Sequence, residues 1–276
     1  MPEADRHAGS GELPLAGRTV LGIFAHPDDE SLACGGTLAR LADAGARVVV
    51  MCASRGEAGS ICDPSLVPDG DSLGCVRARE LREAAAILGV AEVILLDHPD
   101  GDLRWDHVPE LHAEIVLMLE RYRPDAVITF AEDGLYWHLD HIGVHERTYT
   151  AVMSLGAAAP PLYYVTMQEG IMPKMVEAAH SKGGAPRDSS FWGIAADAFG
   201  VGAKPPTFVI DVRDWVPRKL AALRCHRTQM GSHNPIAWIS DEEARQWLGT
   251  EQFRRAALDT SGDAILEHLG EIQHVD

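Results

Sequence analysis

The sequence of 276 residues predicts a single α/β domain built around a mostly parallel sheet. Short apolar runs alternate with amphipathic stretches, which is the pattern of successive strand, helix and strand units. A hydrophobic content of 46% is enough for one full-sized core, and α/β chains of this length are commonly one domain. Polar clusters follow several of the apolar runs, as expected where parallel strands bring their loops to one edge.

The first half of the chain predicts the clearest elements. We expect strands at 18–25, 46–53, 91–96 and 125–130, with helices at about 30–44, 76–88 and 107–122. Each expected helix carries apolar residues at helical spacing, as Leu32, Leu38 and Leu41 do in the first. Gly45 and Gly89 stand where the first two helices should end.

The second half predicts fewer regular elements. Residues 162–165 and 208–210 indicate strands, 214–229 a helix, and 241–270 one or two helices packed on the outside. The stretch 167–205 is rich in Gly and Pro, so we expect an irregular loop, and loops of this length often determine specificity.

The first 17 residues are polar and contain Pro, Gly and acidic residues, which predicts a disordered leader. The domain then covers 18–276. The leader has no apolar core typical of a signal peptide, and no run in the chain is long enough to span a bilayer. We therefore expect no stable membrane anchor.

The charge of the chain excludes some partners. Acidic residues outnumber Lys and Arg by 41 to 24, which gives a formal net charge of −17 at pH 7. Nucleic-acid binding needs cations that neutralise phosphates, and anionic membranes attract basic segments, so neither partner is expected. The acidic surface is explained best as a solvated surface that keeps the protein in solution.

The five cysteines predict a reducing compartment. Their number is odd and they form no CxxC pair, so neither a disulfide framework nor a structural zinc knuckle is indicated. Reduced thiols are typical of the cytoplasm, where we expect this protein to work.

The run 25–30, Ala-His-Pro-Asp-Asp-Glu, is the most informative motif, because it places one imidazole and three carboxylates directly behind the first strand. A second cluster, His138-Leu139-Asp140-His141, follows the fourth strand. By itself the first run could be a turn in which Asp28 or Asp29 caps the next helix. Its pairing with the second cluster favours a metal site.

Catalytic zinc typically has three protein ligands and one position for water, and His26, Asp29 and His141 would supply such a set. Asp28 would then remain as a base for the proton of the attacking water. Iron(II) fits two histidines and one carboxylate as readily as zinc does.

The second cluster also offers groups that could stabilise charge. An imidazolium of His138 held by Asp140 could stabilise an oxyanion or protonate a leaving amine, and Tyr136 could donate a hydrogen bond to the same oxygen. His145 lies four residues after His141, a spacing that could add a ligand, although such a histidine is more often satisfied by its neighbours.

Five motifs in the same order resemble those of the LmbE-like or PIG-L superfamily of metal-dependent de-N-acetylases. The resemblance covers about residues 18–150, and the motifs are 25–30, Gly56-Glu57-x-Gly59, Arg77-x-x-Glu80-Leu81, Pro99-Asp100-Gly101 and His138-x-Asp140-His141. Residues 226–229, His-Arg-Thr-Gln, also resemble an H-x-x-Q element of many members, for which the sequence suggests no mechanism.

The resemblance implies a Rossmann-like three-layer sandwich and assigns roles to residues. Zn²⁺, or Fe²⁺, would bind His26, Asp29 and His141, with Asp28 as the general base. The remaining implied roles are stabilisation of the tetrahedral intermediate by His138, tuning of His138 by Asp140, help from Tyr136 at the oxyanion, and substrate binding by Arg77, Asp100 and Glu57.

The function predicted from these features is that of a metal-dependent hydrolase. It would remove an N-acyl group, above all acetyl, from an amino sugar or a sugar-containing metabolite. An amide of a thiol conjugate or another non-sugar amide is the alternative substrate, and a non-catalytic metal-binding protein is the alternative of another class. The presence of Asp28 argues against that last alternative. The partner is then a small N-acylated molecule, and the sequence leaves the acyl chain and a homo-oligomeric state open.

Overall fold

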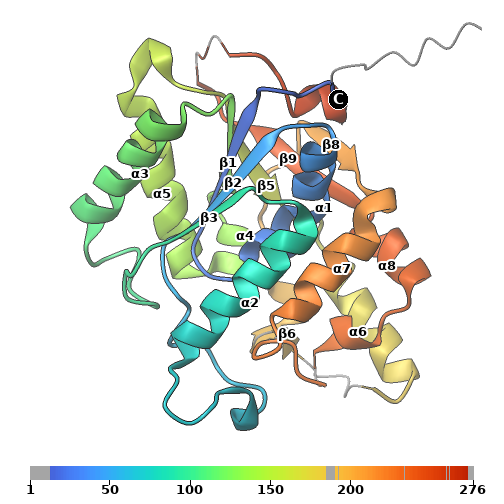
Figure 1. The fold of residues 1–276 in the computed structure, drawn as a ribbon. Coiled ribbons are helices and arrows are strands. Elements are labelled where there is room, and N and C mark those ends of the chain that lie inside the picture. The colour runs from blue at the N-terminus through green and yellow to red at the C-terminus, as the bar shows by residue number, and fades with distance from the viewer. Residues whose placement is uncertain are drawn as a thin grey trace, which may run out of the picture.

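The computed structural model has one central sheet between two layers of helices, which confirms the expected α/β three-layer architecture (Figure 1). It describes residues 13–184, 190–191, 193–232, 234–258, 260 and 262–272. The strands of the central sheet are β1 (Thr19–Phe24), β2 (Arg47–Cys52), β3 (Glu92–Leu95), β4 (Ala126–Phe130), β5 (Leu162–Thr166), β8 (Phe208–Asp211), β9 (Thr250–Arg255) and β10 (Glu271–Ile272).

The sheet order is β10-β8-β9-β5-β4-β1-β2-β3. The first five strands of the chain run parallel to one another, whereas β9 and β8 continue the sheet in antiparallel pairs. The chain builds outward from β1 to β3 and then returns to place β4 on the other side of β1. In open α/β sheets, ligands bind at such a reversal of strand order, outside the carboxyl ends of the strands.

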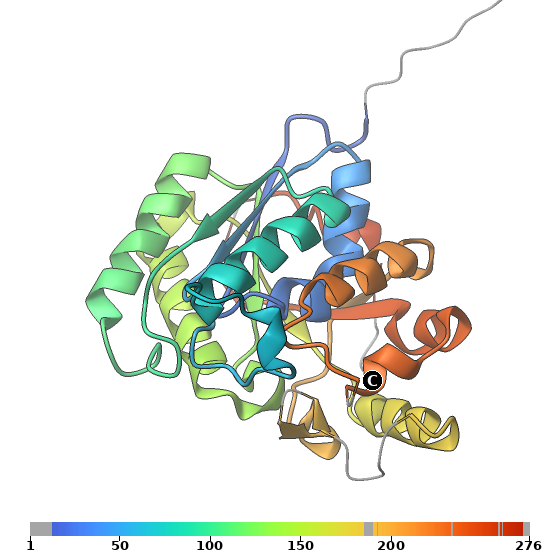
Figure 2. The ribbon, with the colours of Figure 1, turned by 60° about the horizontal axis from the view of Figure 1, so that its bottom comes forward.

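Helices cover both faces of the sheet, as Figures 1 and 2 show. One face carries α1 (Asp29–Asp43), α2 (Leu73–Leu88) and α7 (Val216–Cys225), which pack against one another. The other face carries α3 (Val108–Tyr122) and α5 (Leu139–Ser154). The shorter elements are α4 (Gly134–Trp137), α6 (Ile171–Ser181), α8 (Asp241–Leu248) and the hairpin of β6 (Ser190–Phe191) and β7 (Ile194–Ala195).

The central strands form where the sequence is continuously apolar. All five residues of β4 and of β5 are buried, as are the last five of β1 and of β2. Such runs are typical of parallel strands that are covered on both faces. Gly89 ends α2 with a φ of 79°, the left-handed conformation that glycine adopts without strain.

The expectation of outer helices over 241–270 is wrong in its main part. Only α8 is a helix of that kind, and β9 follows it as an inner strand between β5 and β8. The sequence of β9, TEQFRR, has one apolar residue, so it gives no hydrophobic signal for a buried strand. Its polar residues are stabilised instead by ion pairs and by backbone pairing with both neighbours.

Two other boundaries differ from expectation. The stretch 167–205 is not irregular throughout, since Met172, Met175 and Val176 of α6 are buried in a small core with Phe191 and Phe199. The helix expected over 214–229 ends at Cys225.

The last five residues of the expected disordered leader, 13–17, belong to the described structure. Residues 13–17 form a turn, and the Leu15 amide donates to the Ala44 carbonyl at 2.8 Å. The remainder of that leader, residues 1–12, lies outside the described residues. Within the described ranges, no helix has the length and apolar character needed to cross a membrane.

Candidate active site

The two predicted clusters meet at the reversal of strand order. His26 to Glu30 follow β1, and Tyr136 to His141 follow β4, the strand beside β1. The rings of His26 and His141 lie 5.3 Å apart between their centroids, and those of His26 and His138 lie 5.0 Å apart. The carboxyl ends of two neighbouring strands thus bring together residues more than a hundred positions apart.

The turn into α1 is strained at Asp28, whose φ is 115°. This conformation is unfavourable for a residue with a side chain and persists only where its surroundings hold it. The Asp28 amide donates to Glu30 Oε2 at 3.0 Å, and the His26 amide donates to Asp29 Oδ2 at 2.8 Å. These two hydrogen bonds fix the turn that presents the side chains of His26, Asp28 and Asp29 at the edge of the sheet.

His26, Asp29 and His141 form a buried group whose ligand atoms all lie within 4.8 Å of one another. The His141 ring lies flat on Phe130, with centroids 4.0 Å apart, and its Nδ1 is 3.0 Å from the Gly134 carbonyl. The carbonyl accepts only, so Nδ1 carries the proton and Nε2 presents a lone pair. That Nε2 faces Asp29 Oδ1 at 3.1 Å without a hydrogen bond.

Two buried acceptors that face each other without a proton between them are unfavourable, and a cation between them relieves the repulsion. The donor set of two imidazoles and one carboxylate therefore fits a divalent metal. A second group, His26, His138 and Asp140, also has metal-ligand spacing. It fits less well, because His138 Nδ1 already accepts the Asp140 amide at 3.2 Å.

The carboxylate of Asp140 is fully buried, and the backbone of a loop donates hydrogen bonds to it. It accepts the amides of Gly101 and Leu103 at 2.7 and 3.0 Å, and its Oδ2 lies 3.0 Å from His26 Nε2. We expected the Asp140 carboxylate to contact His138. Instead, Asp140 contacts His138 through its backbone amide. Asp140 therefore orients His26 and the loop of Asp100.

His138 lies at the start of α5 and is half-buried. Since its Nδ1 accepts a backbone hydrogen bond, the neutral ring carries its proton on Nε2. Burial, together with the neighbouring His141 and His26, lowers the pKa of His138 to about 4. The ring is thus a neutral hydrogen-bond donor at neutral pH.

Asp28 lies in a different environment from Asp29. Burial raises the pKa of Asp28 to about 6, although the Arg77 guanidinium opposes this shift. Arg77 Nη2 donates to Asp28 Oδ2 at 3.1 Å and to the Pro27 carbonyl at 2.6 Å, and Nη1 donates to the Gly56 carbonyl at 2.8 Å. A carboxylate with a pKa near neutrality is suited to accept and return a proton.

Most of these residues line one cavity. Of the predicted site residues, seven line it: His26, Asp28, Asp29, Arg77, Asp100, Tyr136 and His138. Tyr136 contributes its ring beside His138, with centroids 5.7 Å apart, and packs on Phe199 from the stretch 167–205.

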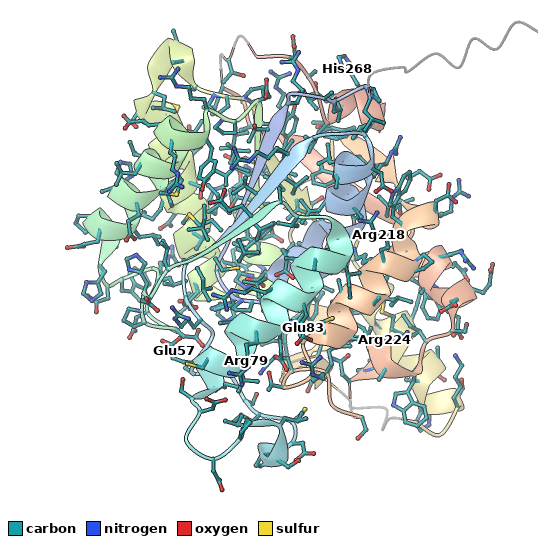
Figure 3. The ribbon with its side chains drawn as sticks, in the orientation of Figure 1. Glu57, Arg79, Glu83, Arg218, Arg224 and His268 are labelled. Atoms are coloured by element: carbon teal, nitrogen blue, oxygen red, sulfur yellow. The ribbon has the colours of Figure 1, made fainter. Side chains whose placement is uncertain are left out.

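The structure does not place Glu57 in the cavity lining. Glu57 is exposed on the loop after β2, and its carboxylate accepts the Asp100 amide at 2.9 Å (Figure 3). It therefore positions Asp100, whose own carboxylate contacts His26 Nε2 at 3.0 Å. His145 is also outside the site, since its Nδ1 lies 2.9 Å from the Phe130 carbonyl and its ring packs on Tyr164.

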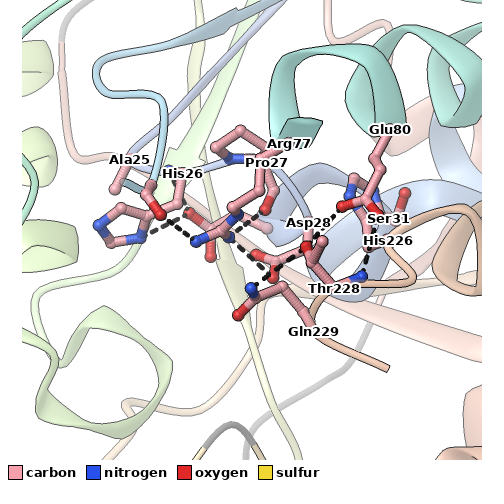
Figure 4. Close-up of polar contacts among 12 residues, drawn as sticks. Ala25, His26, Pro27, Asp28, Ser31, Arg77, Glu80, His226, Thr228 and Gln229 are labelled. Carbon is pink, nitrogen blue, oxygen red and sulfur yellow. Dashed lines mark hydrogen bonds and ion pairs between the residues drawn. The ribbon is translucent and has the colours of Figure 1, made fainter. Parts of the chain in front are cut away.

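Residues of the H-x-x-Q element contact the segments that carry the site residues (Figure 4). His226 Nε2 contacts Glu30 Oε1 at 3.1 Å, and both side chains are fully buried. Thr228 donates its amide and its hydroxyl to Glu80 at 2.9 and 2.7 Å. Gln229 reaches the cavity and donates through Nε2 to the Ser60 carbonyl at 3.0 Å. The sequence flagged the element by resemblance, but nothing in its pattern indicated these contacts.

Comparison with known proteins agrees with this geometry. Residues 21–152 match the family described as PIG-L: GlcNAc-PI de-N-acetylase. A 1D-myo-inositol 2-acetamido-2-deoxy-alpha-D-glucopyranoside deacetylase of Thermobispora bispora is 33% identical over 272 residues, covering 87% of this chain and 88% of the relative. The enzyme of that name from Acidothermus cellulolyticus is 31% identical over 261 residues, covering 86% and 88%.

Solved structures share the fold. The N,N'-diacetylchitobiose deacetylase from Pyrococcus horikoshii superposes with a TM-score of 0.60 at 21% identity, covering 87% of this chain and 84% of that one. The conserved protein TT1542 from Thermus thermophilus gives 0.58 at 25% identity, covering 87% and 94%. The chain therefore belongs to the PIG-L family of de-N-acetylases, as its motifs predict.

Proposed function

We propose that the protein is a metal-dependent hydrolase that removes the N-acetyl group from an amino sugar or a sugar-containing metabolite. One observation carries this proposal. Asp28, whose pKa is raised, lies beside the neutral donor His138 and beside a set of side chains that could bind a metal. The curated relatives support the substrate class, because they are named for a deacetylase of a glucosamine linked to inositol.

His26, Asp29 and His141 would hold the metal, with zinc as the expected ion and iron(II) as the other ion that suits this donor set. Such an ion, when bound, acts as a Lewis acid and lowers the pKa of water. The bond of His141 Nδ1 to the Gly134 carbonyl leaves Nε2 as the ring nitrogen that could act as a ligand, beside the buried carboxylate of Asp29.

The chain supplies the proton transfers. An Asp28 oxygen takes a proton from the water whose oxygen bonds to the amide carbon, while Arg77 holds Oδ2 in place. Asp28 then returns that proton to the nitrogen as the carbon–nitrogen bond breaks, which yields the free amine. The Nε2–H of His138 donates to the carbonyl oxygen as its negative charge develops, with Tyr136 beside it.

Two features support the proposed compartment and the proposed specificity segment. The five cysteines are all free, which supports a reducing compartment and hence the cytoplasm. Ile194 lines the cavity and Phe199 packs on Tyr136, which supports a role of the stretch 167–205 in specificity.

The substitution Asp28→Asn tests the role of the base. The amide keeps the size of the side chain but cannot accept the proton, so kcat for acetate release should fall by about 10²- to 10⁴-fold. Metal analysis of the purified variant should give the same metal content as the wild type, because Asp28 is not in the ligand set. Full activity of a metal-loaded Asp28→Asn variant would exclude this mechanism.

A further inference from the structure

Asp28 is the residue that directly precedes α1, and its conformation there is unusual. An aspartate at this position normally has an extended backbone, and its carboxylate accepts the first free amides of the helix. Asp28 instead has a φ of 115° and makes no side-chain hydrogen bond to α1. The residue lines the catalytic cavity. Its strained backbone thus leaves the carboxylate available for chemistry.

The start of α8 shows the ordinary arrangement. Ser240 precedes this helix with a φ of −73°, and its hydroxyl accepts the Glu243 amide at 3.3 Å. Glu243 Oε2 in turn accepts the Ser240 amide at 2.7 Å, which completes a capping box. At α1, Glu30 makes only the second of these bonds, to the amide of Asp28. The start of α1 therefore omits the side-chain bond that would occupy the base.

Two buried charged side chains hold the peptide group between Pro27 and Asp28. Arg77 Nη2 donates to its carbonyl oxygen at 2.6 Å (Figure 4), and Glu30 Oε2 accepts its amide at 3.0 Å. Arg77 is 4% exposed and Glu30 is fully buried. A change of Asp28 to a negative φ would rotate this peptide group and break both hydrogen bonds. These hydrogen bonds therefore offset the strain at Asp28.

Glu30 is itself fixed by contacts to its other oxygen. The Ser31 hydroxyl donates to Oε1 at 2.5 Å, and His226 Nε2 lies 3.1 Å from the same atom. Ser31 and His226 are both fully buried. Glu30 is not among the described residues that line the catalytic cavity. An influence of Glu30 on the reaction would therefore pass through the backbone of Asp28.

We propose that Glu30 is a positioning residue for the general base, because it holds the Asp28 amide so that the Asp28 carboxylate faces the cavity instead of capping α1. The inference rests on the proposed function, in which Asp28 moves the proton. The three acidic residues of the motif then have separate tasks. Asp28 takes the proton, Asp29 is a candidate metal ligand, and Glu30 fixes the backbone.

Substitution of Glu30 should lower kcat much more than it changes KM. Glu30→Ala removes the acceptor, so Asp28 should relax and kcat should fall about 10²-fold, with KM within about threefold of the wild type. The metal content should not change. Glu30→Gln keeps an oxygen of the same reach and should restore kcat to within about threefold of the wild type. Glu30→Met fills the same space without an acceptor and replaces Glu30→Ala if that variant does not fold.

Glu243→Ala is the matched control, because it removes the equivalent hydrogen bond from a helix whose preceding residue is already relaxed. Its kcat should equal that of the wild type. Three results would overturn the proposal: wild-type kcat in Glu30→Ala, a Glu30→Gln variant as impaired as Glu30→Ala, or loss of metal together with activity in Glu30→Ala.

Unfolding in urea tests the conformation of Asp28 without a substrate, so it separates a failure of this inference from a failure of the proposed function. Asp28→Gly relieves the strain, whereas Asp28→Asn keeps it and can cap α1 once the backbone relaxes. The urea midpoint of Asp28→Gly relative to that of Asp28→Asn should therefore be higher in the wild-type background than in the Glu30→Ala background. The same difference in both backgrounds would contradict the role of Glu30.

Discussion

Arg77 occupies space that two glycines leave open. A Cβ on Gly56 would lie 2.2 Å from Arg77 Nη1, and one on Gly59 would lie 2.7 Å from the same atom. Gly56 also has a φ of 65°, which favours glycine. The Gly-x-x-Gly spacing of the sequence thus exists to let the loop after β2 wrap the guanidinium that holds Asp28.

Gly56→Ala should therefore impair catalysis as well as stability. The methyl group would displace Arg77 from Asp28 Oδ2, and we expect kcat to fall about tenfold or more. Gly70→Ala is the matched control, since Gly70 also has a positive φ, of 86°, but no atom lies within 4 Å of the added Cβ. Gly70→Ala should lose about 1 kcal/mol in urea unfolding because of its positive φ, and Gly56→Ala should lose more, since the buried guanidinium must also move. An equal kcat for the two variants would contradict the role of Arg77.

Prediction from sequence worked for residues next to strand ends and failed for residues that arrive from elsewhere. His26, Asp28 and Asp29 follow one apolar run and His138 follows another, so the parallel sheet brings them together. Gln229 reaches the cavity from the turn after α7, where no periodicity indicates a direction. Glu57 sits in a motif, but its side chain bonds to the Asp100 backbone instead of lining the cavity.

At the level of elements, the middle of α1 depends on the late strand β9. The helix is interrupted at Cys34, whose φ of −147° is not helical. The amides of Gly36 and Thr37 donate to Glu251 of β9 at 2.9 and 2.7 Å. Lys219 of α7 donates to the same carboxylate at 2.6 Å, and both charged side chains are almost fully buried. Glu251 thus joins α1, α7 and the sheet.

Glu251→Gln should strongly destabilise the protein. It leaves the buried ammonium of Lys219 without a carboxylate, and breaking such a pair costs about 3–5 kcal/mol. Urea unfolding monitored by circular dichroism measures the loss. Glu83→Gln is the control, since Glu83 pairs with Arg227 at the surface (Figure 3) and exposed pairs contribute about 0–1 kcal/mol. A cost below about 1 kcal/mol for Glu251→Gln would show that the pair is dispensable.

The reliance of β9 on polar contacts with distant residues explains why the sequence predicted β1 to β5 but not β9. Four of the five parallel strands, β1, β2, β4 and β5, are buried almost throughout and are therefore mainly apolar. In β9, Glu251 is buried because it binds a cation and two amides, and Arg254 pairs with Glu132. These contacts link residues far apart in the chain, so hydrophobic patterning in one segment cannot reveal them.

On the scale of the whole molecule, the buried contact of His226 with Glu30 couples stability to pH. Burial alone lowers the pKa of His226, but the Glu30 carboxylate, with that of Asp28, outweighs this effect and the net pKa is raised. A raised pKa in the folded state means that folding favours the protonated ring. Its contribution is therefore full below the unfolded pKa of about 6.5 and is lost as pH rises through the folded value.

His226→Gln should reveal this coupling. The difference in unfolding free energy between the wild type and the variant should be largest at about pH 5–6 and shrink as the pH rises. Unfolding should be measured in the presence of a metal chelator, because metal binding is itself pH-dependent. His268→Gln, at an exposed histidine, is the control for the loss of an imidazole ring as such. A difference that grows with pH would contradict the assigned direction.

The position of β9 in the chain has a consequence for biosynthesis. Ribosomes make proteins from the N-terminus, so His26, Asp29 and His141 are complete long before Thr250–Arg255 leave the exit tunnel. Until then α1 lacks Glu251, and Glu30 lacks His226 for part of that interval. A nascent chain thus displays these three side chains before the contacts that hold α1 and the turn before it exist, so the candidate site is completed only in the finished chain.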